Sequence, residues 1–212
     1  MLENILNWLA REIISLINSL GYGGVFLLMA LESANIIIPS EIIMPFSGFL
    51  VARGNFSFWG VVFWGAAGNL VGSIFSYKLA SVIISLREKS KIVNFLIPQS
   101  LLEKSQRWFF RWGEATTFFS RLLPIIRTFI SFPAGLGKMN FWRFCLYTFL
   151  GSFLWSTLLT YLGLVLGENW PTLRTYFEKF DYLVAALIVG SVVLWLIKHL
   201  NGSRNKNQPK NF

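Results

Sequence analysis

Four ionisable residues lie inside two strongly apolar stretches of the chain. Glu32 and Glu41 belong to the first stretch, and Arg121 and Arg127 belong to the second. A charge near the centre of a bilayer costs about 2.5–3.5 kcal/mol on insertion scales, so such groups need one another, a substrate or water. Arginine keeps its proton and presents a planar fork of N–H donors that suits phosphate. The pattern therefore predicts a binding site for an anion inside a membrane.

The two glutamates add the prospect of proton exchange. Burial strengthens a carboxylate's hold on its proton, and a nearby cation weakens that hold. A glutamate that faces both an arginine and a water path could exchange protons as a cavity opens to alternate sides. We therefore expect Glu32 and Glu41 to couple proton movement to binding. The alternative is that the four charges form structural ion pairs that tie the two stretches together.

Both apolar stretches contain residues that a straight membrane-spanning helix does not need. The stretches run over residues 24–54 and 115–137. Proline breaks the backbone ladder, and the freed carbonyl must face protein or water rather than lipid. We therefore predict that each stretch forms a bent, re-entrant helical hairpin. The residues expected to shape the hairpins are Pro39, Pro45, Gly48, Pro124, Pro133 and Gly135.

The arginines need such a break to meet. Arg121 and Arg127 are six residues apart in the sequence, with Pro124 between them. In an unbroken helix their side chains would point about 240° apart. We expect the break at Pro124 to turn both arginines toward one cavity.

Three further segments are uncharged, and we predict that each spans the membrane. They cover residues 54–77, 144–167 and 182–197. Gly68 and Gly72 in the first span form a small-xxx-small pair that permits close helix contact. Asn69 lies between them and is expected to hydrogen-bond to another helix. Cys145, the only cysteine, is expected to pack in the interior.

Two segments have the alternation of apolar and polar faces that is typical of helices lying in a membrane interface. They cover residues 4–20 and 86–114. We expect the first to end at Gly21, Gly23 and Gly24, and the second to end at Gly113. The Trp and Tyr side chains are interpreted mostly as interface anchors.

Composition agrees with a membrane domain. The 212 residues are 54% hydrophobic and 14% charged, whereas soluble domains carry about 25% charged residues. The net charge of +9 comes from short basic clusters between apolar runs, a pattern that favours an anionic membrane face over nucleic acid. We expect one membrane domain over residues 1–200 and a disordered, basic tail over 201–212.

Loop charges predict the orientation. Residues 87–111 contain six basic and two acidic residues, and the chain from residue 198 onward contains four basic residues and no acid. By the positive-inside rule both regions face the cytoplasm. We therefore predict a multi-pass protein of the cell (plasma or inner) membrane whose C-terminus is cytoplasmic.

The two halves of the chain share one plan. Each has an interfacial helix, a proline-broken hairpin and an uncharged span, and Gly72-Ser-Ile-Phe75 echoes Gly151-Ser-Phe-Leu154. The predicted orientation makes the hairpins enter from opposite sides, as in the inverted repeats of transporters. The expected fold is an all-α integral membrane protein with two inverted repeats. Each repeat has a re-entrant hairpin and a transmembrane helix, and a C-terminal transmembrane helix and interfacial helices complete the fold.

Three motifs resemble the DedA family of membrane proteins, whose common domain is also called SNARE-associated or VTT. They are E-S-A-N-I-I-I-P-S-E-I-I-M-P-F-S-G (32–48), G-N-L-V-G-S-I-F-S-Y (68–77) and F-F-S-R-L-L-P-I-I-R-T-F-I-S-F-P-A-G (118–135). The resemblance covers roughly residues 20–170. It implies two opposed re-entrant hairpins and the translocation of phospholipids or undecaprenyl phosphate, with proton dependence.

The resemblance also carries over to single residues. In two places the chain departs from the family: Ser73 stands where an acid often follows the second glycine, and no glycine follows Tyr77. The residues that match the family's essential acids and arginines are Glu32, Glu41, Arg121 and Arg127.

We therefore predict a membrane transporter, or flippase, for an anionic lipid, coupled to protons or another cation. A structural or assembly factor for the membrane or envelope, without transport, is the alternative. An enzyme acting on a lipid phosphate is less favoured, because such chemistry needs a nucleophile with a base, or a metal cluster. The single histidine, His199, lies at the end of the last predicted span. We expect no metal and no cofactor, and association into a homo-oligomer stays open.

Overall fold

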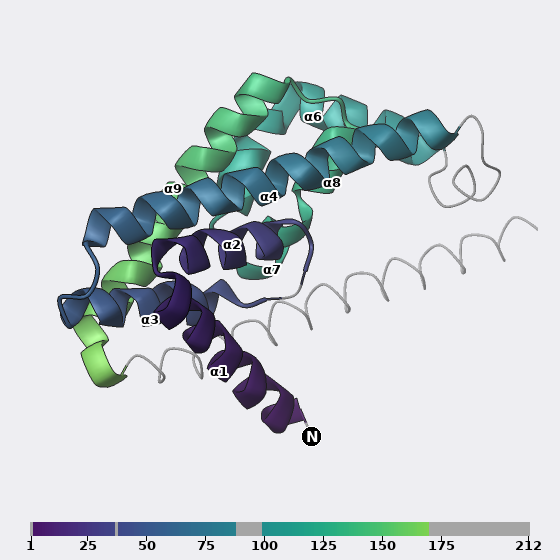
Figure 1. Ribbon diagram of the computed structural model, residues 1–212. Coiled ribbons are helices and arrows are strands. Elements are labelled where there is room, and N and C mark those ends of the chain that lie inside the picture. Colours follow the sequence, from purple (N-terminus) through teal and green to yellow (C-terminus); the bar gives the residue numbers. More distant parts are fainter. Residues whose placement is uncertain (1, 37, 88–98, 170–212) are drawn as a thin grey trace, which may run out of the picture. The chain divides into compact units, whose positions relative to one another are not determined.

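The computed structural model describes residues 2–36, 38–87 and 99–169, and all regular elements in these ranges are helical (Figure 1). The predicted span 182–197 and tail 201–212 lie outside the described residues. Helix α1, Leu2–Leu20, confirms the predicted first helix. It ends at Gly21, whose φ of 60° suits a residue without a Cβ.

The first predicted hairpin is a pair of short helices, α2 (Tyr22–Ser33) and α3 (Ser40–Ala52). Gly23 and Gly24, which were expected to help end α1, lie inside α2. Figure 1 shows the chain turning back from α2 into α3. The helices have 12 and 13 residues, which makes them about 18–20 Å long. Neither is therefore long enough to cross a hydrocarbon core of about 30 Å.

Within the part of the chain that the structure describes, two helices are long and apolar enough to cross a membrane, α4 (Phe58–Arg87) and α9 (Phe141–Leu166). Helix α9 matches its predicted span, and the Asn140 side chain caps it by accepting the Arg143 N–H at 3.1 Å. Helix α4 continues past the predicted end at residue 77, because Lys78 lies at an exposed position where its charge does not stop the helix. Its 30 residues span about 45 Å.

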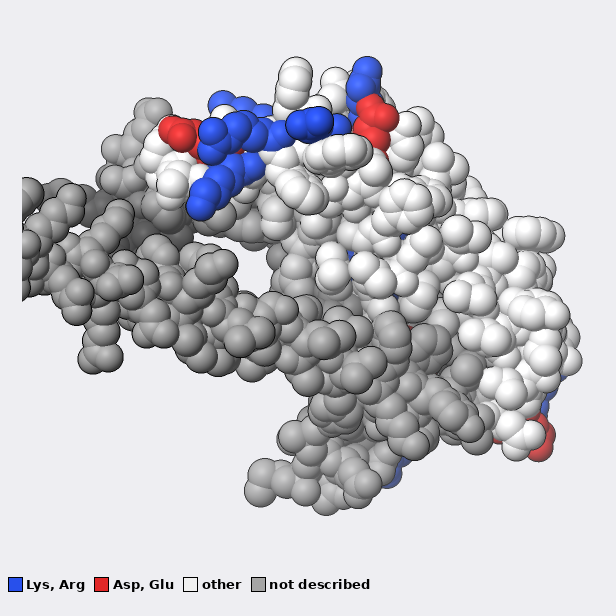
Figure 2. Space-filling view, turned by 180° about the vertical axis from the view of Figure 1, so that it is seen from behind, with Lys and Arg blue, Asp and Glu red and all other residues white. Residues whose placement is uncertain are grey.

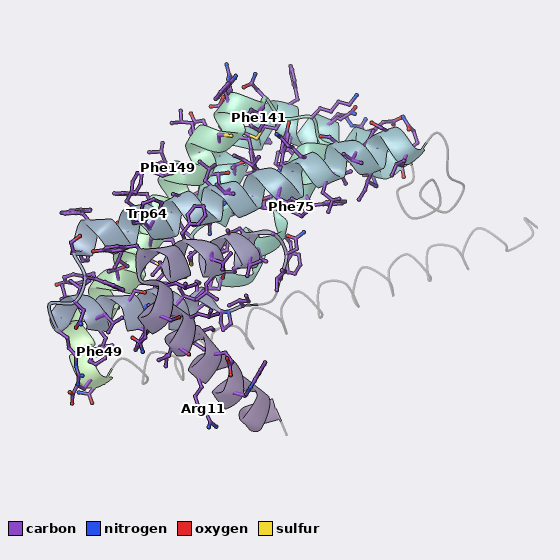
Figure 3. All side chains as sticks on the ribbon, viewed as in Figure 1. Arg11, Phe49, Trp64, Phe75, Phe141 and Phe149 are labelled. Atoms are coloured by element: carbon purple, nitrogen blue, oxygen red, sulfur yellow. The ribbon has the colours of Figure 1, made fainter. Side chains whose placement is uncertain are left out.

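Large apolar side chains cover the outside of both long helices. Trp64 and Phe75 on α4, both labelled in Figure 3, are 42% and 59% exposed. On α9, Leu154 and Val165 are 49% and 63% exposed. Such contiguous apolar exposure is rare on soluble monomers and is typical of a surface that faces lipid.

The second predicted hairpin differs from the first. Helix α6 (Gln99–Ser120) runs through Gly113, so the predicted stop at that glycine is wrong. A single glycine inside a helix costs only about 1 kcal/mol, and tertiary packing overrides it here. After α6 the chain forms two six-residue helices, α7 (Pro124–Phe129) and α8 (Ser131–Leu136).

The helices of the two halves pack on the two long helices in a crossed pattern. Helix α2 packs on α4 and α3 packs on α9, whereas α6 packs on α9 and α8 packs on α4. Each half thus places one arm of its hairpin on its own long helix and the other arm on the long helix of the other half.

Glycines make these contacts close. A Cβ added at Gly72 of α4 would overlap the Ala30 carbonyl of α2. A Cβ at Gly48 of α3 would overlap the backbone of α9, and one at Gly135 of α8 would overlap the Tyr77 carbonyl of α4. Gly48 and Gly135 therefore hold the second arm of each hairpin against the opposite long helix.

A small apolar core lies where α4, α6, α8 and α9 meet. Its buried members are Tyr77, Phe109, Ala134, Met139 and Phe144. The partly buried Cys145 packs against this cluster, as predicted.

Candidate functional site

A buried ion pair joins the two hairpins. Glu32, near the end of α2, accepts a hydrogen bond through Oε1 from Nη2 of Arg127 on α7. The same nitrogen also donates to Oγ of Ser40, at the start of α3. The Ser40 backbone N–H donates in turn to Glu32 Oε1 at 3.2 Å. Glu32 is 4% exposed and Arg127 is 2% exposed, so the pair ties three helices together without contact with solvent.

Arg121 is even more buried, at 1% exposure, and its partners are neutral. Its guanidinium donates to the backbone carbonyl of Arg127 at 2.9 Å and to Ser131 Oγ at 2.7 Å. Longer contacts reach Thr148 Oγ1 at 3.4 Å and Asn69 Oδ1 at 3.5 Å. Within the described residues, no carboxylate forms an ion pair with Arg121. Its charge therefore has no direct counter-ion there.

The break in the helix brings the Arg121 guanidinium to the backbone carbonyl of Arg127, whereas a common cavity for both arginine side chains stays a prediction. Helix α6 ends at Ser120, and a turn over residues 121–123 leads into α7. Pro124 is the first residue of α7, a position where its missing N–H costs nothing. The break lies just before the proline rather than at it, and it lets Arg121 reach the carbonyl of Arg127.

The two glutamates do not have equal roles in this structure. Glu41, in the first turn of α3, is 7% exposed. Its charge interacts with that of Glu32, but among the described residues it makes no ion pair. Of the structural ion pairs that the alternative interpretation expects among the four charges, the described residues contain one, because Arg121 is held by α8, α9 and α7 instead.

Asn69 hydrogen-bonds to another helix, as predicted, and also contacts Arg121. Its Oδ1 accepts a hydrogen bond from Ser152 Oγ of α9 at 2.7 Å, which links α4 to α9. The same oxygen lies 3.5 Å from Arg121 Nη1. The helix-linking amide thus also helps to hold the buried guanidinium.

Trp155 is a site residue that the sequence interpretation missed. It was grouped with the interface anchors, but it is 5% exposed, and the Arg127 guanidinium lies 5.3 Å from its ring centre. This cation–π contact stabilises the positive charge in an apolar setting. A sequence signal was available, because hydroxyl residues occupy every fourth position on that side of α9. They are Thr148, Ser152, Ser156 and Thr160.

Several buried polar atoms at the site have no hydrogen-bond partner among the described residues. Glu32 keeps Oε2 unpaired, and both Arg121 and Arg127 keep an unpaired Nε. The hydroxyls of Ser156 and Thr160 on α9 are unpaired as well. Buried polar groups are normally satisfied by protein or ordered water. The cluster therefore has free hydrogen-bonding capacity, although the site is closed in this structure.

Comparisons with known proteins identify the family of the chain. The sequence profile of the VTT domain matches residues 38–165. The "Alkaline phosphatase-like protein" of Lactococcus lactis subsp. cremoris is 31% identical, over 92% of this chain and 95% of its own length. "Undecaprenyl phosphate transporter A" of Bacillus subtilis is 30% identical, over 89% and 93%. "Protein DedA" of Escherichia coli is 31% identical, over 63% and 57%.

No solved structure matches the chain. The matched profile includes Glu41, Arg121 and Arg127, and it covers more than half of the sequence. By the family profile and the long alignments alike, the chain belongs to the DedA family of membrane proteins, which share the VTT domain.

Proposed function

We propose that this protein is a transporter that moves an anionic lipid, undecaprenyl phosphate or a phospholipid, across the membrane with proton coupling. The observation that carries the proposal is the buried Arg121, which has neutral partners only and lies beside Arg127. A buried cation without a counter-ion attracts an anion strongly in a medium of low dielectric constant. The name of the Bacillus subtilis relative supports a lipid phosphate as that anion.

The phosphate binds to the two arginines. Each guanidinium keeps one Nε–H without a partner among the described residues, and arginine forks match phosphate oxygens in bidentate geometry. Arg121 is already fixed by Ser131. Arg127, in contrast, is engaged by Glu32, so the phosphate has to replace the Glu32 carboxylate.

Protons control that replacement. A protonated Glu32 has no charge to hold Arg127, so proton uptake releases the guanidinium for the phosphate. After the lipid leaves, loss of the proton restores the Glu32–Arg127 pair and closes the site. Glu41 lies close enough for its charge to interact with that of Glu32, and it supplies the second position for the proton.

Access to the site alternates between the two sides of the membrane. In this proposal, α2–α3 and α6–α8 are re-entrant hairpins that enter from opposite sides as inverted repeats. The crossed packing of the hairpin arms on α4 and α9 supports this symmetry. Movement of one hairpin opens the ion pair to its own side, since the pair lies where the hairpins meet.

Translocation in proteoliposomes tests the proposal. The purified protein is reconstituted with a labelled lipid phosphate or phospholipid, and its transfer between leaflets is followed with and without a pH gradient. We expect Arg121→Gln and Arg127→Gln to abolish transfer, and Glu32→Gln to remove the response to the gradient. The matched control is Arg53→Gln, which breaks the exposed pair with Glu168. Wild-type transfer by the Arg121→Gln, Arg127→Gln double variant would overturn the proposal.

A charge swap separates transport from a purely structural or assembly role. Because Arg127 is the partner of Glu32, the informative swap is Glu32→Arg with Arg127→Glu. An ion pair that only ties the hairpins together works with the positive charge on either residue. Full function of the swapped protein in cells would therefore favour the structural role. We expect the swapped protein to fold and to remain inactive, because the positive charge then lies at position 32 instead of position 127, where the phosphate binds.

The enzyme alternative is tested in the same vesicles. Because the Lactococcus lactis relative is named as alkaline phosphatase-like, the reaction to measure is release of inorganic phosphate from a lipid phosphate. We expect transfer of intact lipid without phosphate release. Release that depends on the wild-type protein would assign the buried arginines to catalysis instead.

A further inference from the structure

A second cationic region lies outside the buried site, in an open cleft of about 1190 Å³. One wall is α6 from Gln106 to Ala115, and the other is formed by Gly137–Asn140 with Arg143 at the start of α9. The buried residues Arg121 and Arg127 do not line it. The cleft is therefore a separate site with its own chemistry.

Positive charge dominates the cleft. Arg107 and Arg111 lie four residues apart and so share one side of α6. Lys138 faces them from the turn before α9, where its backbone has a φ of 52°. None of these three forms an ion pair with another described residue. Arg143 is neutralised by Glu114 at 2.6 Å, and Arg111 also lies over the Trp112 ring at 5.5 Å. Three cations of the cleft are thus without an ion pair among the described residues.

Exposed aromatic side chains near the cleft are typical of a membrane interface. On the same helix Phe110 is 95% exposed, and Trp108 and Trp112 are 56% and 52% exposed. Trp142, beside Arg143, is 77% exposed. Aromatic side chains of this kind collect at the level of lipid headgroups. Figure 2 shows several Lys and Arg residues, with Glu or Asp residues among them, along one edge of the molecule next to a surface largely without charge.

One residue that lines the cleft contacts a residue close to Arg121 in the chain. Met139 lines the cleft, and its sulfur accepts a hydrogen bond from Thr117 Oγ1 at 3.3 Å. Thr117 lies one helical turn before Arg121 on the same chain segment.

We propose that this cleft binds the phosphate of an anionic membrane lipid and loads that lipid into the transport site. The loading step rests on the proposed function, whereas binding does not. The three free cations account for the phosphate, and the exposed aromatic residues favour a lipid over free phosphate because they place the cleft where acyl or prenyl chains begin. The volume exceeds that of a phosphate group alone and accommodates a headgroup with the first part of its chain.

The test compares binding with transport in one set of proteins. The full chain is placed in phosphatidylcholine vesicles with increasing fractions of a lipid phosphate, and binding is followed by energy transfer from tryptophan to a labelled lipid. We expect the variant Arg107→Gln, Arg111→Gln, Lys138→Gln to need at least about tenfold more lipid for half-saturation, in binding and in transport. Its maximal transport rate at saturating lipid should equal that of the wild type.

Two controls make the result specific. Arg11→Gln with Arg53→Gln removes exposed cations that do not line the cleft, and it should leave half-saturation unchanged. Arg127→Gln should keep lipid binding and lose the maximal rate. The thermal unfolding midpoint of each variant shows that the substituted surface still folds.

Each outcome bears on a different claim. Unchanged half-saturation in the triple variant overturns the cleft as a lipid site. Displacement of the lipid by inorganic phosphate at the same concentration overturns the assignment to a lipid and indicates a site for free phosphate. Binding that depends on the three cations, together with no transport by the wild type, keeps the cleft and rejects the transporter.

Discussion

The two halves of the molecule both pack their shorter helices on α4 and α9, but they bury charges of opposite sign. The first half supplies Glu32 and Glu41, and the second supplies Arg121 and Arg127. In the first half the second arm is the single helix α3, whereas in the second half it is broken into α7 and α8. Each half alone would bury two charges of one sign, which is costly in an apolar medium, so we expect each half to need the other for stability.

The contacts of the hairpins with their own long helices differ as well. Gly72 of α4 meets the backbone of Ala30, so α2 lies backbone against backbone. The matching Gly151 of α9 meets the Arg121 side chain, and a Cβ there would lie 2.8 Å from the Arg121 Cβ. The first hairpin is thus fixed by rigid groups, and the second is fixed partly by the Arg121 side chain, which the proposed function assigns to phosphate binding. We expect the second hairpin to be the one that moves.

The largest effect should come from removing one member of the buried Glu32–Arg127 ion pair. Arg127→Gln leaves Glu32 buried without its partner, and removal of one member of a buried pair costs about 3–5 kcal/mol. Glu41→Gln removes a buried charge that makes no ion pair in the described structure, so it should cost far less. Thermal unfolding in detergent micelles compares the two variants.

The double variant Glu32→Gln, Arg127→Gln is the control for this comparison. It removes both members of the pair, so it should recover most of the stability lost in Arg127→Gln. A loss in Arg127→Gln no greater than that in Glu41→Gln would contradict the unequal roles of the two acids.

The next largest effect concerns Gly72 of α4 and Gly151 of α9, which occupy matching positions. Gly72→Ala forces α2 away from α4, and overpacking of this kind costs about 1–3 kcal/mol. Gly151→Ala meets a side chain and the Phe118 carbonyl, so it should shift Arg121 and reduce transport more than stability. The transport rate and the free energy of unfolding are measured for both variants. Equal ratios of lost transport to lost stability in the two variants would argue against a mobile second hairpin.

The smallest effect concerns the serines that follow these glycines. Ser152 donates to Asn69 at 2.7 Å, so Ser152→Ala should cost about 1 kcal/mol. Ser73 is equally buried, but its hydroxyl has no partner among the described residues. Ser73→Ala should therefore change the free energy of unfolding by only a few tenths of a kcal/mol. Equal costs would show that water or another group pairs with Ser73.

The parts of the fold that the sequence predicted well depend on local signals. The turn between α2 and α3 follows from Pro39, which directly precedes α3 and has an extended backbone with φ −80° and ψ 116°. Helix α9 follows from an uncharged segment long enough to span. Boundaries set by single residues were less certain: Gly113 did not end α6, and Lys78 did not end α4.

The charged residues of the candidate site were recognisable from the sequence, whereas their pairing and the burial of Trp155 were not. Burying charges in apolar segments is costly enough to make Glu32 and Arg127 recognisable from sequence alone. The choice of Glu32 over Glu41 as the partner of Arg127 depends on how distant helices pack, and so does the burial of Trp155 beneath the guanidinium. Local sequence holds no signal for such long-range contacts.

The shortness of α2 has an electrical consequence. Its 12 residues cover about 18 Å of a hydrocarbon core of about 30 Å. Where water follows a re-entrant hairpin as far as Glu32, the membrane voltage drops over the remaining layer of about 12 Å. A voltage of 100 mV does about 2.3 kcal/mol of work on each elementary charge that crosses it. In the proposed transporter that work is concentrated on the lipid phosphate during its short passage past Arg121 and Arg127.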